Sequence, residues 1–358
     1  MARRQPMSSS AGSKDADRAI LRPSASVILV SPTNKVLLLH RVHTSSAFPS
    51  AYVFAGGNLS AFQDGEIPAA DSPARHLDSD VYRRAAVRET FEESGILLAK
   101  RHKDDTHLIA VRNSKRERIR KAVHANELKL TDWLAEIGAE PDIDALIPFT
   151  RWITPSNVPK RFTTQMYLYF LPLNEDDGDI MESSSQIPNP TSDGGVEHTA
   201  AEFDYASNWL SLANSKAYPR TSDGSKEDVI MFPPQVFLLH LLAPLLPLPK
   251  ERPFRIEELS KQRDDVLAFL QTSQPLWADK CISPYHIGVA DDGRTIVGLD
   301  KPGPSELVRG GRRGDFERVI LTKFSKAGPT QGEVRWRRDI PSDNLSPKAN
   351  CSVGLMYL

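Results

Sequence analysis

The stretch "RRAAVRETFEESGILLA" at residues 83–99 carries three glutamates within five positions: Glu89, Glu92 and Glu93. An α-helix advances by about 100° per residue, so the three carboxylates fall on one narrow face. Val87 and Phe91 form an apolar i,i+4 pair on the opposite face. The pattern predicts an amphipathic helix that buries one stripe and presents an acidic ridge.

The acidic ridge has two interpretations, and these positions alone leave both open. Like charges at neighbouring helix positions repel by roughly a few tenths of a kcal/mol each unless a cation lies between them. Such a ridge is either a solvated surface or a site for hard divalent cations, which prefer oxygen ligands. The neighbouring sequence distinguishes the two.

A predicted glycine turn precedes the helix. The segment "AYVFAGGNLSAF" (51–62) predicts a short strand that ends in a turn at Gly56 and Gly57, where the backbone can approach another group closely. After a polar loop, "LDSD" at 77–80 predicts the N-cap of the acidic helix, and Gly95 its C-terminal end. Carboxylates beside such a turn can hold Mg²⁺ or Mn²⁺, ions that clamp phosphate oxygens and lower the pKa of a bound water. The combination favours a metal site.

The composition is that of an ordinary globular protein. The chain has 358 residues, of which 40% are hydrophobic and 25% charged, with a formal net charge of −1. The absence of a basic excess argues against a nucleic-acid partner. The longest apolar stretch, "VFLLHLLAPLLPLP" (236–249), is too short and too interrupted to span a bilayer, so we expect a buried helix there and no membrane association.

The compartment follows only coarsely from the sequence. Two cysteines, Cys281 and Cys351, are too few for a disulfide framework, which fits an intracellular, reducing location. The polar, Ser-rich start contains Asp15 and Asp17, which count against a mitochondrial leader, and the final "GLMYL" is not an SKL-type peroxisomal address. Mitochondrion, peroxisome and cytosol therefore all stay open, and the sequence does not predict an oligomeric state.

Strands and helices alternate along the chain, which predicts an α/β or α+β core. We expect a disordered tail at 1–22 and a catalytic-type domain at 23–250, with a long loop at 58–79 and a mobile insertion at 174–196. Residues 251–358 hold short β-like runs between Gly and Pro residues and predict a β-rich C-terminal extension. The expected strands of the core lie at 24–31, 35–41, 96–99, 146–155 and 162–173, with helices within 105–137 and after Pro233 and Pro234.

The glycine turn and acidic helix together resemble the Nudix box, GX5EX7REUXEEXGU, in which U is a large aliphatic residue. The second half matches position for position, from Arg88 to Ile96, apart from Thr90 at one aliphatic place. Asp80 stands eight residues before Arg88, where the pattern has Glu. Gly57 precedes Arg88 by 31 residues instead of 14, which makes the loop 17 residues longer than in the standard motif.

The resemblance is strongest to the branch of peroxisomal and mitochondrial coenzyme A and acyl-coenzyme A diphosphatases. Further segments are similar to that branch: "VLLLHR…FPSAYVFAGGNLS", "RWITPSNVPKRFTTQMYLYFLP" and "IMFPPQVFLL", so that roughly residues 23–245 are covered. The resemblance implies a Nudix-type α/β/α sandwich with a mixed sheet, followed by the β-rich extension. It also implies Mg²⁺ or Mn²⁺ as cofactor.

The resemblance assigns roles to named residues. Metal binding falls to Glu89 and Glu93 first and then to Glu92, and catalysis to Glu89, Glu92 and Arg88, which orients a glutamate. Substrate binding is expected at four positions: Gly56, Gly57, Arg41 and Arg161. Weaker candidates are Glu197 and Glu202 as general base, Lys160 as a phosphate contact, and Tyr167 and Trp152 as stacking partners of a base.

The expected activity is metal-dependent hydrolysis of a diphosphate linkage. The resemblance implies coenzyme A or an acyl-coenzyme A as substrate, cleaved to 3′,5′-ADP and an (acyl)phosphopantetheine. Two alternatives stay open: the same chemistry on a nucleotide sugar, a dinucleotide or an RNA cap, and a Nudix-fold module that binds without catalysis. Acyl-chain preference, the general base and the role of the C-terminal extension are not determined by the sequence.

Overall fold

A mixed eight-stranded sheet forms the centre of the computed structural model, which describes residues 20–45, 49–173, 190–191, 197–214, 218–219, 226–227, 229–249 and 255–345. Its strands follow the order β12-β7-β8-β1-β2-β3, with β4 paired to β1 and β9 paired to β2. Two neighbour pairs are parallel, β1 with β8 and β12 with β7, and the others are antiparallel. The strands are β1 Arg22–Val30, β2 Val36–Arg41, β3 Tyr52–Val53, β4 Ala55–Asn58, β7 Ile147–Ile153, β8 Phe162–Phe170, β9 His198–Asp204 and β12 Cys281–Ile282.

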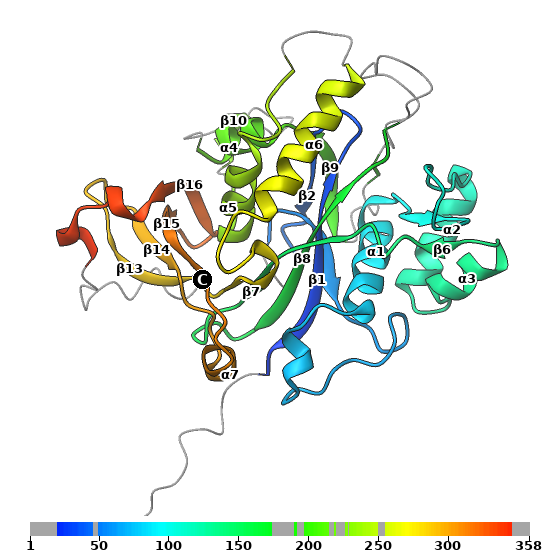
Figure 1. The fold of residues 1–358 in the computed structure, drawn as a ribbon, viewed down its shortest axis with the longest axis horizontal. Coiled ribbons are helices and arrows are strands. Elements are labelled where there is room, and N and C mark those ends of the chain that lie inside the picture. The colour runs from blue at the N-terminus through cyan, green and yellow to red at the C-terminus, as the bar shows by residue number, and fades with distance from the viewer. Residues whose placement is uncertain are drawn as a thin grey trace, which may run out of the picture.

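Helices cover both faces of this sheet (Figure 1). In β1, Val27 and Leu29 face one hydrophobic cluster while Ile28 and Val30 face the other, as the period of two in a strand requires. The first face carries α1 Asp80–Ser94, α2 Asn113–His124 and α3 Leu130–Glu136. The second carries α4 Ala206–Asn214, α5 Pro233–Leu242 and α6 Ile256–Leu270. Burial on both sides explains why β1 is apolar throughout residues 27–30.

The C-terminal residues form a second, antiparallel sheet that packs against α4 and α5 (Figure 1). Its strands are β13 Tyr285–Val289, β14 Thr295–Leu299, β15 Asp315–Phe324 and β16 Pro329–Trp336, with α7 Ser305–Arg309 between the middle two. Leu299 and Ile320 belong to the same hydrophobic cluster as Trp209 of α4 and Val236 of α5. The predicted β-rich C-terminal part and the mixed α/β core are both confirmed.

The smaller elements lie outside the two large sheets or connect them. They are the strand pairs β5 Ala99–Lys100 with β6 Glu140–Pro141 and β10 Tyr218–Pro219 with β11 Lys226–Glu227, and the 3₁₀ helices Pro73–His76, Trp277–Asp279, Arg337–Asp339 and Ser342–Leu345. Within the described ranges, every helix is too short or too polar to cross a membrane.

Three sequence-based expectations differ from the structure. Gly56 and Gly57 do not form a turn, because both lie within β4 and pair with β1. Of the strand expected at 96–99, only Ala99 lies in a strand, the short β5. Strand β1 begins at Arg22, inside the predicted tail. Residues 1–19 of that tail and the insertion at 174–196, apart from Pro190 and Thr191, lie outside the described residues.

Candidate metal and substrate site

The acidic face of α1 lies against β4, and the two glycines make this close approach possible. The backbone N–H of Gly56 donates to Glu93 Oε2 over 2.7 Å. A Cβ on Gly57 would lie 2.6 Å from the carboxylate of Glu89. The predicted closeness between the glycine pair and the acidic helix is therefore present, although a strand rather than a turn provides it.

The ends of α1 fix where its carboxylates point. The helix follows Ser79 and ends at Gly95, whose backbone has a φ of 73° and whose N–H donates to the carbonyl of Phe91. A φ in this range favours glycine, so the residue stops the helix one position after Ser94. Val87 and Phe91 are fully buried, as predicted.

The acidic ridge itself is not solvated. Glu92 and Glu93 are 8% and 5% exposed, and the side chain of Glu89 is 13% exposed. Burial raises the pKa of Glu89 to about 7, with Arg88 opposing the shift and Glu92 adding to it. Burial, followed by the negative charge of Glu89, raises the pKa of Glu93 well above its usual value. Carboxylates held together at this cost fit a divalent cation, because the ion restores the favourable interactions that the lost water supplied.

Arg88, a buried residue of α1, connects the acidic residues through hydrogen bonds. Its guanidinium donates to both oxygens of Asp64, each over 2.9 Å, to Glu89 Oε1 over 2.8 Å and to Glu92 Oε1 over 2.9 Å. A planar fork of donors suits this arrangement of paired oxygens. These hydrogen bonds hold Glu89 and Glu92 in place, and the catalytic role of Arg88 stays a prediction.

Asp64 was missed in the sequence, where Asp80 was considered instead. Asp80 is exposed at the start of α1 and pairs with Arg84 at 3.8 Å, whereas Asp64 pairs with Arg88. The signal for Asp64 was its distance from the glycine: the box acid follows the glycine by six residues, and Asp64 follows Gly57 by seven. Because the long loop lies between Asp64 and α1, counting eight residues back from Arg88 leads to Asp80 and not to Asp64.

Glu92 has a different setting from the other two glutamates. Its Oε1 accepts from Arg88, and its Oε2 lies 3.0 Å from Nδ1 of His124 on α2. Two protein partners therefore hold this carboxylate, whereas Glu89 and Glu93 face β4. Metal binding by Glu92 stays a prediction.

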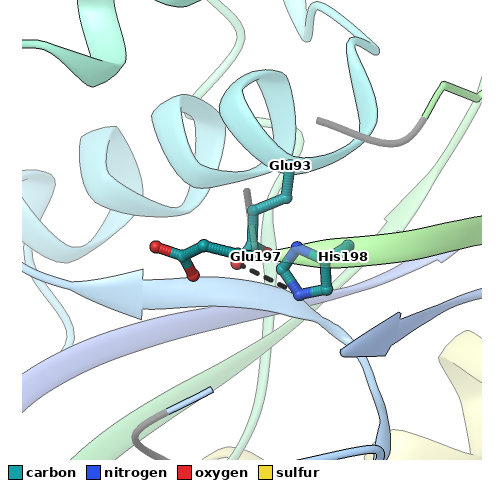
Figure 2. A group of neighbouring side chains, drawn as sticks. All are labelled: Glu93, Glu197 and His198. Carbon is teal, nitrogen blue, oxygen red and sulfur yellow. Dashed lines mark ion pairs between the residues drawn. The ribbon is translucent and has the colours of Figure 1, made fainter. Parts of the chain in front are cut away.

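The start of β9 approaches Glu93 from the other side. Glu93, Glu197 and His198 each offer one ligand atom within 4.8 Å of the others (Figure 2). His198 is fully buried, and its Nε2 lies 3.7 Å from Glu93 Oε1. Glu197 was among the candidates predicted from the sequence, but His198 was not, because no spacing along the chain connects β9 with α1. Glu202, the other candidate, is exposed further along β9.

A cavity of about 500 Å³ opens beside these carboxylates. Its acidic part is lined by Glu89, Glu92, Glu93 and Glu197. Its apolar wall includes Trp152, Phe162, Met166, Phe232 and Pro233, and three cationic side chains contribute to the lining: Arg22, Arg41 and Lys160. Such a shape suits an elongated ligand with an anionic part and an apolar part.

The candidate substrate residues divide between this cavity and the core. Arg41 lines the cavity and pairs with Glu197 at 3.3 Å. Arg161 is buried, donates to the carbonyls of Thr154 and Pro155, and is not part of the lining, so its neighbour Lys160 is the better placed of the two. Tyr167 is a core residue whose hydroxyl donates to Asp78, whereas Trp152 lines the cavity.

One family profile and two curated relatives are of the same family. The profile of the NUDT19 Nudix domain matches residues 66–193. A Caenorhabditis elegans protein named as a nudix hydrolase is 32% identical over 41% of this chain and 43% of its own length. The acyl-coenzyme A diphosphatase NUDT19 of Xenopus laevis is 31% identical over 34% of this chain and 42% of its own length. The match thus spans less than half of each of these two relatives.

Solved structures give a weaker likeness. A NUDIX hydrolase from Alicyclobacillus acidocaldarius aligns with 62% of this chain and 90% of its own, at 20% sequence identity and a TM-score of 0.42.

Proposed function

The chain belongs to the Nudix family, and from this premise we propose that it hydrolyses a diphosphate linkage with a divalent cation held by Glu89 and Glu93. The observation that carries the proposal is the pair of buried carboxylates with raised pKa values that face a cavity beside Gly56 and Gly57. Mg²⁺ and Mn²⁺ both accept such oxygen ligands.

The proposed substrate is coenzyme A or an acyl-coenzyme A, cleaved to 3′,5′-ADP and an (acyl)phosphopantetheine. The name of the Xenopus laevis relative supports this choice. The cavity supports it further, since Arg22, Arg41 and Lys160 suit phosphate groups while the wall around Trp152 and Phe162 suits the apolar parts of an acylated arm.

Each residue of the site contributes a distinct function to this chemistry. When bound, the cation lowers the pKa of a water and neutralises the charge of the phosphate oxygens. Arg88 fixes Glu89 and Glu92 in one orientation through its hydrogen bonds. The N–H of Gly56 fixes Glu93, and Arg41 places a positive charge at the cavity beside Glu197. Positioning and charge neutralisation supply most of what phosphoryl substitution needs.

An activity assay tests the proposal directly. The purified protein is incubated with a panel of diphosphates that includes coenzyme A, acetyl-coenzyme A, a nucleotide sugar, a dinucleotide and a capped RNA, with Mg²⁺, with Mn²⁺ and with chelator. Glu93→Gln is the test variant, and Glu202→Gln, an exposed glutamate outside the cavity lining, is the matched control. We expect metal-dependent release of 3′,5′-ADP that falls by about 10²-fold or more in Glu93→Gln and is unchanged in Glu202→Gln.

The remaining outcomes separate the alternatives. Turnover of a different diphosphate would retain the chemistry and replace the substrate. A folded protein that binds coenzyme A but hydrolyses no member of the panel, with or without metal, would identify a binding module and refute the proposed catalysis.

A further inference from the structure

His198 approaches the acidic site from an element that the Nudix box does not include. It is the first residue of β9, fully buried, and pairs in register with Arg41 of β2. The register shifts at this point, because His40 opposes Ala200 while Arg41 opposes His198. Such a bulge re-aims the side chains at a strand end, and bulges are frequent beside active sites.

Glu197 and His198 present their side chains to the same place although they are neighbours in sequence. Successive residues of a regular strand point to opposite faces. Glu197 lies just before β9 begins, so this alternation does not apply to it. Its carboxylate pairs with Arg41 at 3.3 Å and still lies within 4.8 Å of the ligand atoms of Glu93 and His198.

The distance between His198 and Glu93 suits two ligands of a shared ion. His198 Nε2 and Glu93 Oε1 are 3.7 Å apart, which is too long for a hydrogen bond (Figure 2). Two donor atoms that each lie about 2.1 Å from one metal ion are about 3.0 to 4.2 Å apart for angles between 90° and 180°. The hydrogen bond from Gly56 to Oε2 of Glu93 directs the other oxygen, Oε1, towards the imidazole.

We propose that Glu93, Glu197 and His198 form a mixed oxygen and nitrogen site that prefers a divalent first-row transition ion over Mg²⁺. The proposal rests on the proposed function, because Glu93 would also bind the cation that acts on the diphosphate. Mg²⁺ favours an all-oxygen, largely hydrated environment, whereas imidazole nitrogen is a good ligand for transition ions. His198 thereby distinguishes Mn²⁺ from Mg²⁺ at a site whose other donors accept both.

Electron spin-echo spectroscopy of the Mn²⁺-loaded wild-type chain tests the proposal without relying on activity. We expect ¹⁴N coupling typical of a directly bound imidazole, and its loss in His198→Gln. His43→Gln is the matched control, since His43 is an exposed histidine shortly after β2, and it is expected to retain the signal. His124→Gln is expected to retain it as well, which separates His198 from the other histidine beside the glutamates.

Calorimetric titration supplies the second measurement. We expect His198→Gln to weaken Mn²⁺ binding by about 10- to 100-fold and Mg²⁺ binding by less than about 3-fold, with His43→Gln unchanged. Thermal melts of the chelated variants establish that each is folded. If His198→Gln does not fold, the ¹⁴N signal of the wild-type chain and of His124→Gln decides the question.

Two results would overturn the proposal. One is a wild-type Mn²⁺ complex without bound nitrogen, and the other is a nitrogen signal and an Mn²⁺ affinity that survive in folded His198→Gln. Each of these two results can be distinguished from a failure of the proposed diphosphate hydrolysis. Metal-dependent hydrolysis without bound nitrogen refutes only the His198 site, and bound nitrogen without hydrolysis of any diphosphate refutes only the activity.

Discussion

Gly56 and Gly57 are adjacent in β4, yet different groups occupy the space beside each. A Cβ on Gly56 would lie 2.4 Å from the carbonyl oxygen of Ala25, which is backbone of the paired strand β1. A Cβ on Gly57 would lie 2.6 Å from the carboxylate of Glu89, which is the far end of a flexible side chain. The first glycine therefore protects the sheet and the second makes room for a site residue.

This contrast gives a paired prediction. Gly57→Ala should displace the Glu89 carboxylate and weaken Mn²⁺ binding by about 10- to 100-fold while leaving the unfolding free energy nearly unchanged. Gly56→Ala should lower the unfolding free energy by about 1 to 3 kcal/mol, because neither strand can move aside freely. Calorimetric titration and denaturant unfolding of both variants measure the two effects. Equal loss of stability in both would contradict the assignment.

Asp64 and Asp80 offer a second comparison of two single residues. Asp64 is 2% exposed and receives two hydrogen bonds from Arg88. Removing one partner of a buried ion pair leaves the other charge inadequately compensated, so Asp64→Asn should cost about 3 kcal/mol of unfolding free energy and reduce activity. Asp80→Asn, which breaks an exposed pair with Arg84, should change stability by less than about 0.5 kcal/mol. Urea unfolding decides which aspartate supports Arg88.

At the scale of the element, α1 is a buried helix with an apolar face that packs in the core and an acidic face that forms the candidate site. Val87 and Phe91 pack in a hydrophobic cluster with the sheet, and Glu89 and Glu93 of the opposite face lie against β4 and β9. Neither face is solvated in the way that an amphipathic surface helix would be. The burial of its carboxylates makes this helix sensitive to both pH and metal.

The stability of the metal-free protein should fall as pH rises towards neutrality. The pKa of Glu89 is about 7 in the folded chain, above its usual value of 4.5, so the folded state binds more protons than the unfolded state between these values. Stability therefore decreases as pH rises through this interval. Metal binding requires the deprotonated carboxylate and strengthens over the same interval.

Thermal melts with Mn²⁺ and with chelator from pH 5.5 to 8 measure this effect. The difference in Tm should widen by about 5 °C or more as pH rises. In Glu89→Gln, the difference in Tm between the Mn²⁺ and chelator samples should vary less with pH, because the glutamine amide does not titrate. A difference in Tm that is constant over this range would refute the role of Glu89 in metal binding.

At the scale of the whole molecule, the C-terminal sheet is joined to the α/β core in two ways. β12 pairs with β7 as an edge strand of the main sheet, and Leu299 and Ile320 share a hydrophobic cluster with Trp209 and Val236. A buried ion pair of 2.8 Å between Lys280 and Asp315 lies at the same junction. The division of the chain at residue 250 stays a prediction about domains.

Removal of residues 255–358 tests how far the core depends on this part. We expect the truncated chain to lose cooperative unfolding, because the apolar surfaces of α4 and α5 would become exposed. Leu299→Ala, at a fully buried position of β14, should cost about 2 to 5 kcal/mol, and Arg335→Ala, at an exposed position of β16, less than about 0.5 kcal/mol. Circular dichroism melts compare them. A truncated chain that unfolds cooperatively at the wild-type Tm would show an independent N-terminal domain.

The sequence by itself determined the parts of this protein that depend on local order. Apolar runs along the chain predicted β1, β2, β7 and β8, and an apolar i,i+4 pair predicted α1, because burial leaves a direct trace in the sequence. Gly95 marked the end of α1 through its backbone conformation. The close approach of Gly56 and Gly57 to the glutamates was also predicted, although the loop between Gly57 and Arg88 is 17 residues longer than in the standard motif.

Only the tertiary structure decided which distant residues complete the site. Asp64 reaches Arg88 across the long loop, and Glu197 and His198 reach Glu93 from a strand more than 100 positions away in sequence. Arg161 and Lys160 are neighbours in sequence, but their local geometry leaves only Lys160 at the cavity. The sequence pattern does not predict these contacts, because they depend on strand pairing, a bulge and the packing of α1 on the sheet.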